Sequence, residues 1–205
     1  MKSPIAPENT TRANAFSLWM TSPMPMVTLT KTFNVSKAMK ASKKQGIKFN
    51  ALLCWCIGKA ASEIKEFYIL PEQGTLYQYD SIAINVIVNN SKGGINSCDI
   101  PFNNDITRFA DDYDRLTAKA ALECNSIFLE DYMIVGTSAM VQTELDSIIN
   151  QYTDKFSNPM VMWGKYRRNW LKTALPISFQ FHHVQMDGGH GATFLEKLQQ
   201  EINKL

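Results

Sequence analysis

This sequence of 205 residues has little cysteine, little net charge and no long apolar run. Its four cysteines show neither the CxxC spacing of a zinc or redox site nor the density of a disulfide scaffold, so we expect reduced thiols in a cytoplasmic protein. The formal net charge of +2 favours neither nucleic acid nor a membrane as a partner. The sequence also lacks an apolar stretch long enough for a membrane span or a signal core.

Aromatic and apolar residues are plentiful. The apolar fraction is 45%, with 11 Phe, 7 Tyr and 4 Trp, which is enough to build a sizeable core. This length is typical of one globular domain, so we expect a single domain over residues 1–205.

Hydrophobic periodicity predicts a mixture of strands and helices. Alternating or β-branched stretches predict strands at 26–35, 76–79, 82–88, 95–100, 132–139, 160–164 and 177–183. Helical spacing and end signals predict helices at 12–19 (capped by Thr10 or Thr11), 36–45 (ended by Gly46), 50–64 (capped by Asn50), 106–116 and 195–205. The elements do not alternate strictly, so we expect an α/β fold: a two-layer sandwich of a mixed sheet with helices on one face.

All three histidines lie in the stretch 179–190, which also holds Asp187 and two glycines. Strand alternation would point His182 and His183 to opposite sides, so only one ring faces a given pocket. The Asp and the glycines would break the regular structure and form a turn beside it. A histidine held rigidly in this way suits a general base, because its ordinary pKa lies near neutrality.

Two other interpretations of this stretch are weaker. One ring packed in the core and the other in solvent would make the pair purely structural. A metal hydrolase that uses His182, His183, Asp187 and His190 is disfavoured, because adjacent strand residues diverge and no carboxylate cluster completes the ligand set, so we expect no metal. The acids Asp111, Asp112 and Asp114 also indicate a solvated helix face rather than a metal site.

The His-His-x-x-x-Asp-Gly stretch resembles the active-site signature of the chloramphenicol acetyltransferase family. Dihydrolipoyl acyltransferase cores, condensation domains and plant acyltransferases share that short motif. Further segments resemble the first family in particular: Lys48-Phe49, Trp163-Gly164-Lys165-Tyr166, 175–180 and the tail helix. The resemblance implies a compact α/β subunit that forms a homotrimer, with active sites in clefts between subunits. It also implies acetyl-CoA as co-substrate and a small hydroxylated molecule, such as chloramphenicol, as acceptor.

The same resemblance assigns roles to individual residues. His183 corresponds to the general base, oriented partly by its own backbone carbonyl, and Asp187 to a structural carboxylate paired with Arg12. Lys48, Lys165 and Tyr166 correspond to coenzyme A contacts, although Asn50 replaces an aromatic residue of the family. The basic and aromatic residues at 165–172 are also compatible with a nucleic-acid patch or a solvated turn, but a hairpin that meets coenzyme A phosphates explains them more simply.

Two departures from the family pattern keep a second function open. The alignment places Val141 where the family has a serine that donates to the oxyanion, and Met162 where it has a threonine. Ser138, Thr137 or Thr143 would supply a hydroxyl after a local shift. The alternatives are therefore an O-acetyltransferase and a non-catalytic or altered-specificity trimer that binds coenzyme A or small molecules.

Overall fold

The computed structural model describes residues 1–153 and 155–205. Its main feature is a seven-stranded mixed sheet. The strands follow the order β2 (Met26–Asn34), β10 (Thr173–His182), β8 (Met160–Gly164), β7 (Met133–Met140), β5 (Ile82–Asn89) and β6 (Ile95–Pro101), and β9 (Arg167–Arg168) also pairs with β10. Strand β7 is parallel to both neighbours and the other pairs are antiparallel.

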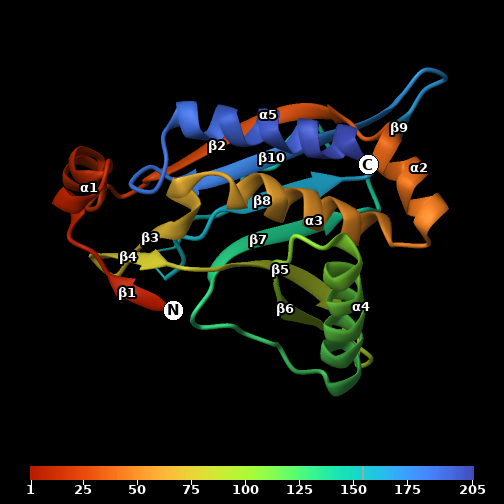
Figure 1. Ribbon diagram of the computed structural model, residues 1–205, viewed down its shortest axis with the longest axis horizontal. Helices are drawn as coiled ribbons and strands as arrows, with labels where there is room; N and C mark the ends of the chain where they lie inside the picture. The colour runs from red at the N-terminus through yellow and green to blue at the C-terminus, as the bar shows by residue number, and fades with distance from the viewer. Residues whose placement is uncertain (154) are drawn as a thin grey trace.

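The helices lie on one face of this sheet (Figure 1). Helices α3 (Phe49–Ser62) and α5 (Gly188–Lys204) pack side by side there, and α4 (Ile106–Glu123) packs beside α3. Helix α2 (Ser36–Gln45) lies at one end of the molecule and α1 (Ala13–Trp19) at the other. The predicted two-layer α/β fold is confirmed. None of the described helices has the length and apolarity to cross a membrane.

The face of the sheet that carries the helices, called the helix face below, is apolar. Phe179 and Phe181 of β10 point toward α5, where the ring centroid of Phe194 lies 4.4 Å from that of Phe179. Phe67 completes this aromatic cluster, and all four side chains are fully buried. Since strand residues alternate, the residues between them must point to the opposite side.

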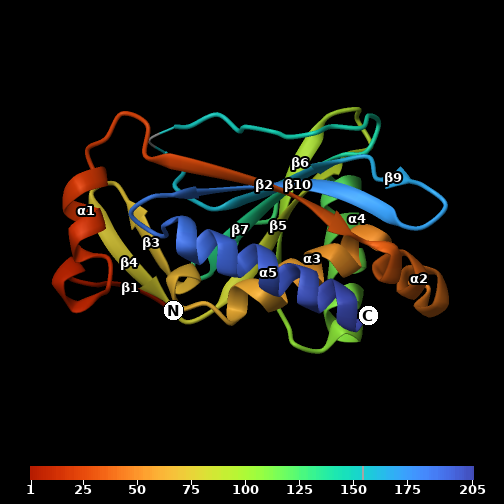
Figure 2. The same ribbon diagram turned by 90° about the horizontal axis from the view of Figure 1, so that it is seen from above.

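The opposite side of the sheet, called the open face below, carries polar side chains and is crossed by a segment of coil (Figure 2). This segment, the described residues of 141–159 (141–153 and 155–159), is tied to β10 by hydrogen bonds. The Ile148 N–H donates to Ser178 Oγ (2.8 Å), and Gln180 Nε2 donates to Asn150 O (3.1 Å). The chain itself therefore shields Ser178 and Gln180, which are both buried.

Several local expectations need correction. Asn50 lies in the first turn of α3 and does not cap it, since the N-cap residue is Lys48. The Thr10 hydroxyl donates to Pro7 O (2.7 Å) and so closes the turn η1 (Pro7–Asn9) instead of capping α1. Helix α4 continues to Glu123, well past the expected end at residue 116.

A small second sheet was missed in the sequence. It has the order β1 (Lys2–Pro4), β4 (Thr75–Tyr79) and β3 (Ile69–Glu72), and it follows the turn η2 (Lys65–Tyr68). Only β4 was predicted. Pro71 lies within β3, and this is tolerated because β3 is an edge strand whose outer side needs no hydrogen-bond donor.

Candidate active site

Strand β10 ends one residue earlier than expected, so the histidine pair lies at a corner. His182 is the last strand residue and is 1% exposed. His183 leaves the strand, and its backbone N–H donates to Pro25 O (2.7 Å) in the segment that leads into β2. The two rings therefore occupy different environments, one inside the protein and one at its edge.

His182 is held in a form that does not suit an accessible base. Its Nδ1 accepts a hydrogen bond from the Val184 N–H (3.1 Å). Burial, together with the nearby His183, lowers the pKa of His182 to about 4. His182 is therefore neutral near pH 7 and contributes to the structure of the corner.

The sequence suggested that Asp187 ends the regular structure in a turn. In the structure, Asp187 is instead the N-cap residue of α5. Its Oδ1 accepts from the Gly189 N–H (3.0 Å) and the His190 N–H (3.2 Å), which is an N-cap arrangement. The two glycines thus form the first turn of the helix. Burial alone would raise the pKa of Asp187, but the bond from His190, the His190 ring and Arg12 together hold it below its usual value.

Arg12 ties this corner together. It is 5% exposed, and its Nη1 donates to Asp187 Oδ2 (3.1 Å) as expected. Its Nη2 also donates to His183 O (2.8 Å) and its Nε to Val184 O (3.0 Å). One guanidinium therefore satisfies the carboxylate and two consecutive backbone carbonyls. Because the Asp187 side chain is 44% exposed, the pair is only partly buried.

The His183 ring is oriented differently from what the resemblance implied. Its Nδ1 is buried and has no hydrogen-bond partner among the described residues, so it does not bind its own carbonyl, which accepts from Arg12. Instead, the ring stacks on Trp19, with the centroids 4.8 Å apart and the planes within 5°. Sequence reasoning placed Trp19 in a helix without giving it a role. The only signal in the sequence was an aromatic residue at the end of a short predicted helix.

The third histidine is part of the helix cap. His190 Nδ1 accepts from the Asp187 N–H (3.3 Å), and its Nε2 lies 3.3 Å from Glu66 Oε1. In the described part of the chain, no group of three or more potential metal ligands comes together.

Lys165 and Tyr166 follow β8 and line a cavity of about 370 Å³. The Tyr166 ring meets the edge of Phe49 (centroids 6.1 Å apart) and carries the Arg168 guanidinium 5.0 Å from its centre. Asn50 lines the same cavity. Lys48 is exposed and pairs with Asp114 (2.9 Å), so it lies beside this cavity but not in its wall.

The structure does not bring the two groups of predicted site residues together. Trp163, two residues before Lys165, pairs with Ile177, and His183 lies six residues further along the same chain. At about 3.3 Å per residue, the histidine corner and Trp163 are separated by about 20 Å, and Lys165 lies beyond Trp163. In Figure 1 the histidine corner and the Lys165 end lie at opposite ends of the sheet, beside α1 and β9 respectively.

Candidate oxyanion donors differ in what their hydroxyls already bind. Val141 follows β7, is 48% exposed and lines the Lys165 cavity. The Thr137 hydroxyl donates to Asn85 O (2.7 Å) on the helix face, and that of Thr143 contacts Glu144 O (3.4 Å). Ser138, which follows Thr137, points to the open face and sits opposite Met162 of β8.

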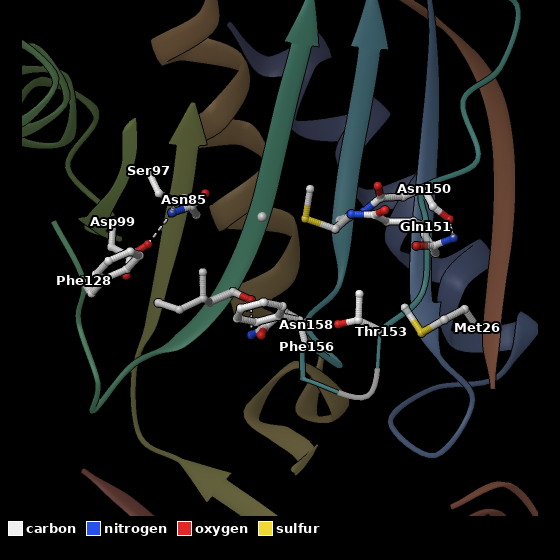
Figure 3. A pocket seen from close by; sticks show the side chains of 14 residues that line it. Met26, Asn85, Ser97, Asp99, Phe128, Asn150, Gln151, Thr153, Phe156 and Asn158 are labelled. Carbon is white, nitrogen blue, oxygen red and sulfur yellow. Dashed lines mark hydrogen bonds between the residues drawn. The ribbon is translucent and has the colours of Figure 1, made fainter. Parts of the chain in front are cut away.

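A second cavity, called the trough below, lies on the open face and has a volume of about 280 Å³. Figure 3 shows side chains from the strands on one side and from the 141–159 segment on the other. Its lining residues combine apolar and polar groups, namely Met26, Asn85, Ser97, Asp99, Phe128, Ile134, Gly136, Asn150, Gln151, Thr153, Phe156, Asn158, Met160 and Gln180. Met26 is the register partner of His182, so one end of the trough approaches the histidine corner.

Comparisons with known proteins are consistent with these features. A family model described as "Chloramphenicol acetyltransferase" matches residues 5–199 of the chain. Chloramphenicol acetyltransferase 3 of Escherichia coli is 24% identical over 183 residues, which cover 85% of this chain and 84% of that protein. A chloramphenicol acetyltransferase of Campylobacter coli is 41% identical over 46 residues, which is 22% of each chain.

Among solved structures, one described as chloramphenicol acetyltransferase superposes with a TM-score of 0.85 at 24% identity, over 98% of this chain and 100% of that one. A probable dihydrolipoamide acetyltransferase from Listeria monocytogenes 4b F2365 gives 0.68 at 14% identity, over 98% and 94%. At these identities, the structural likeness establishes a shared fold.

Proposed function

This chain belongs to the chloramphenicol acetyltransferase family of acyltransferases, and from that premise we propose that it transfers the acetyl group of acetyl-CoA to a hydroxyl of a small molecule such as chloramphenicol. The observation that carries the proposal is the corner around His183. Arg12 holds the backbone of this residue and Trp19 fixes the plane of its ring, which leaves an imidazole presented at the edge of the subunit.

The chemistry follows from that placement. His183 takes the proton of the acceptor hydroxyl as the oxygen attacks the thioester carbonyl, giving a tetrahedral intermediate. The carbon–sulfur bond then breaks, and the imidazolium returns the proton to the leaving thiol. Of the hydroxyls considered, we assign the oxyanion donor to Ser138, because those of Thr137 and Thr143 are directed at backbone carbonyls.

We assign the cavity at the end of β8 to the adenine and phosphate end of coenzyme A. Tyr166, supported by Phe49 and Arg168, offers a rigid ring on which an adenine can stack, and Lys165 supplies an ammonium for a phosphate. The proposed contribution of Lys48 is weaker, since Asp114 already pairs with its charge. We assign the trough on the open face to the acceptor molecule.

We propose a homotrimer with shared sites, as the family resemblance implies. The Lys165 cavity holds the adenine and phosphate end of coenzyme A, and the thioester lies at the far end of the pantetheine arm. A neighbouring copy can supply the histidine corner, as expected for active sites between subunits. The single domain and the cytoplasmic location likewise remain predictions.

The test is a thiol-release assay with acetyl-CoA over a panel of hydroxylated acceptors that includes chloramphenicol. His183→Ala should lower kcat by about 10²–10⁴-fold without lowering the melting temperature. The non-catalytic alternative predicts binding of coenzyme A or acceptor with no thiol release from the wild type. Wild-type activity that survives His183→Ala would contradict the assignment of the base.

Shared sites can be tested with hybrids. His183→Ala and Tyr166→Ala chains are each expected to be weakly active. If the base and the coenzyme A contacts come from different chains, a mixed trimer made by co-refolding contains one site with both groups intact and regains activity. A mixture no more active than the average of its two parents would count against shared sites.

A further inference from the structure

Asp99 is a buried carboxylate without a cationic partner. It lies on the open face of β6 and is 3% exposed. Its Oδ1 accepts from Asn85 Nδ2 (2.6 Å) and its Oδ2 from the Leu129 N–H (2.9 Å). Since each oxygen accepts a hydrogen bond, the contacts suit the ionised form. None of the ion pairs among the described residues includes Asp99.

The trough that Asp99 lines also contains an unsatisfied hydrogen-bond acceptor. Gln180 is 2% exposed, and its Nε2 donates to Thr28 Oγ1 (3.1 Å) and Asn150 O (3.1 Å). Its Oε1 has no hydrogen-bond partner in the described part of the chain. Gln180 and Asp99 come from β10 and β6, near opposite ends of the trough, as Figure 3 indicates for Asp99 and Asn150.

The lining of the trough is asymmetric in charge. Asp99 is the one charged side chain among the residues that line it. Phe128, which lies beside Asp99 in Figure 3, and Ile134 make that end apolar. Burial raises the pKa of Asp99 above its usual value. The hydrogen bonds from Asn85 and Leu129 lower this pKa but do not cancel the effect of burial. A carboxylate in such surroundings is stabilised when a ligand places a positive charge against it.

A neutral acceptor leaves this carboxylate uncompensated. Removing water from the trough without supplying a cation increases the desolvation cost of Asp99. A protonated amine on the acceptor reverses the effect, because a hydrogen bond between two charged groups is about twice as strong as one between neutral groups. The pocket therefore favours one class of hydroxylated molecule over another.

We propose that Asp99 is a specificity-determining residue that binds a protonated amine, and that the acceptors of this enzyme are amino alcohols. This inference rests on the proposed acetyl transfer and adds the class of its acceptor. The hydroxyl is acetylated by His183 of a neighbouring copy, as in the shared sites proposed above, while the ammonium group of the same molecule lies against Asp99. The free Gln180 oxygen, near the other end of the trough, offers a hydrogen-bond acceptor to the distal end of the molecule.

The test uses a matched pair of acceptors: chloramphenicol, which is neutral, and the amine that remains when its dichloroacetyl group is removed. Both carry the same two hydroxyls, and the amine is protonated near neutral pH. The wild type should have the higher kcat/KM for the amine. Asp99→Asn keeps an oxygen that can accept from Leu129, and it should lower the ratio of amine to chloramphenicol kcat/KM by about 10- to 100-fold.

Asp111→Asn, on the exposed surface of α4, removes the same charge outside the trough and should leave the ratio unchanged. If Asp99→Asn lowered kcat/KM equally for both acceptors, or left the ratio at its wild-type value, the carboxylate would be structural and the inference wrong. Should Asp99→Asn fold poorly, Asp99→Ser, judged by the same ratio in its folded fraction, provides the second variant.

A binding measurement separates this inference from the proposed function. Calorimetric titration without acetyl-CoA needs no turnover. Wild-type protein should bind the amine at least about 10-fold more tightly than chloramphenicol, and Asp99→Asn should remove that preference. Absence of thiol release with every acceptor would reject acetyl transfer while leaving this result in place. Equal binding of the two compounds would overturn the role of Asp99, whatever the enzyme does.

Discussion

The two faces of the large sheet use the same strands for different purposes. On β10, Phe179 and Phe181 point to the helix face and join a buried aromatic cluster, while Ser178 and Gln180 between them point to the open face and hold the 141–159 segment. On β7, Thr137 contacts Cys54 of α3, while its neighbour Ser138 faces the other way. Alternation along one strand thus separates residues that stabilise the fold from residues that are available for binding and chemistry.

The largest expected effect lies on the helix face. Phe179→Ala should lower the free energy of unfolding by about 3–5 kcal/mol, because it leaves a cavity between Phe67 and Phe194. Gln180→Ala, one residue further, should cost much less, since it removes hydrogen bonds but no close-packed ring. Urea unfolding of both variants measures the difference, and equal losses would erase the distinction between the faces.

On β7, we expect the open-face residue Ser138 to affect activity and the helix-face residue Thr137 to affect stability. Ser138→Ala should lower kcat by about 10²–10³-fold with little change in KM, because an oxyanion donor acts on charge that develops in the transition state. Thr137→Val removes a buried hydrogen bond to Asn85 O and should lower stability instead. Steady-state kinetics and thermal melts on both variants provide the check.

If Val141→Ser raised kcat while Ser138→Ala left it unchanged, the oxyanion donor would belong at the end of β7. The assignment to Ser138 would then be wrong.

His182 points to the open face but is buried, and we expect it to make the stability of the protein depend on pH. Its pKa is lowered to about 4 in the folded protein, against about 6.5 in an unfolded chain. The unfolded state therefore binds a proton first as the pH falls. The stability associated with neutral His182 is present above pH 6.5 and is lost progressively toward pH 4. Between pH 7 and pH 5 the loss should be about 2 kcal/mol.

Urea unfolding at the two pH values, compared with His182→Gln, isolates this contribution. The variant should have a smaller pH dependence than the wild type. Identical pH dependence in the two proteins would show that another group is responsible.

The smallest expected effect concerns Arg12 and Asp187, at the corner that joins the two faces. Their coupling in a double-mutant cycle with Arg12→Ala and Asp187→Asn should be about 1 kcal/mol, because solvent screens the half-exposed carboxylate. Arg12→Ala alone should cost more than Asp187→Asn, since it also strands the carbonyls of His183 and Val184, whereas Asn can still cap α5. Unfolding free energies of the wild type, the two single variants and the double variant test both statements. Strict additivity would show that the two side chains are not coupled.

Much of the secondary structure could be predicted from local pattern. The alternation of Ile82, Ile84 and Val86 identified β5, and Gly46, with a φ of 71°, ended α2 as expected. The prediction failed where a local signal was ambiguous. Two glycines after Asp187 indicated a break, but in the structure Asp187 is an N-cap and the glycines open a helix. Strand β3, which was missed, contains Pro71, and this proline is tolerated because β3 lies at an edge of its sheet.

The sequence by itself determined the two sets of side chains on each strand, the amphipathic helices that cover one set, and the motif that contains His183 and Asp187. Those features depend on residues close together in the chain, because the apolar residues recur every two residues in a strand and every 3.6 residues in a helix. Only the tertiary structure decided that Gln180 and Asp99 line one trough, that Trp19 stacks on His183, and that Lys165 lies at the opposite end of β10 from that corner. Strand order and register bring such groups together or hold them apart, and neither is encoded in the spacing along a single strand.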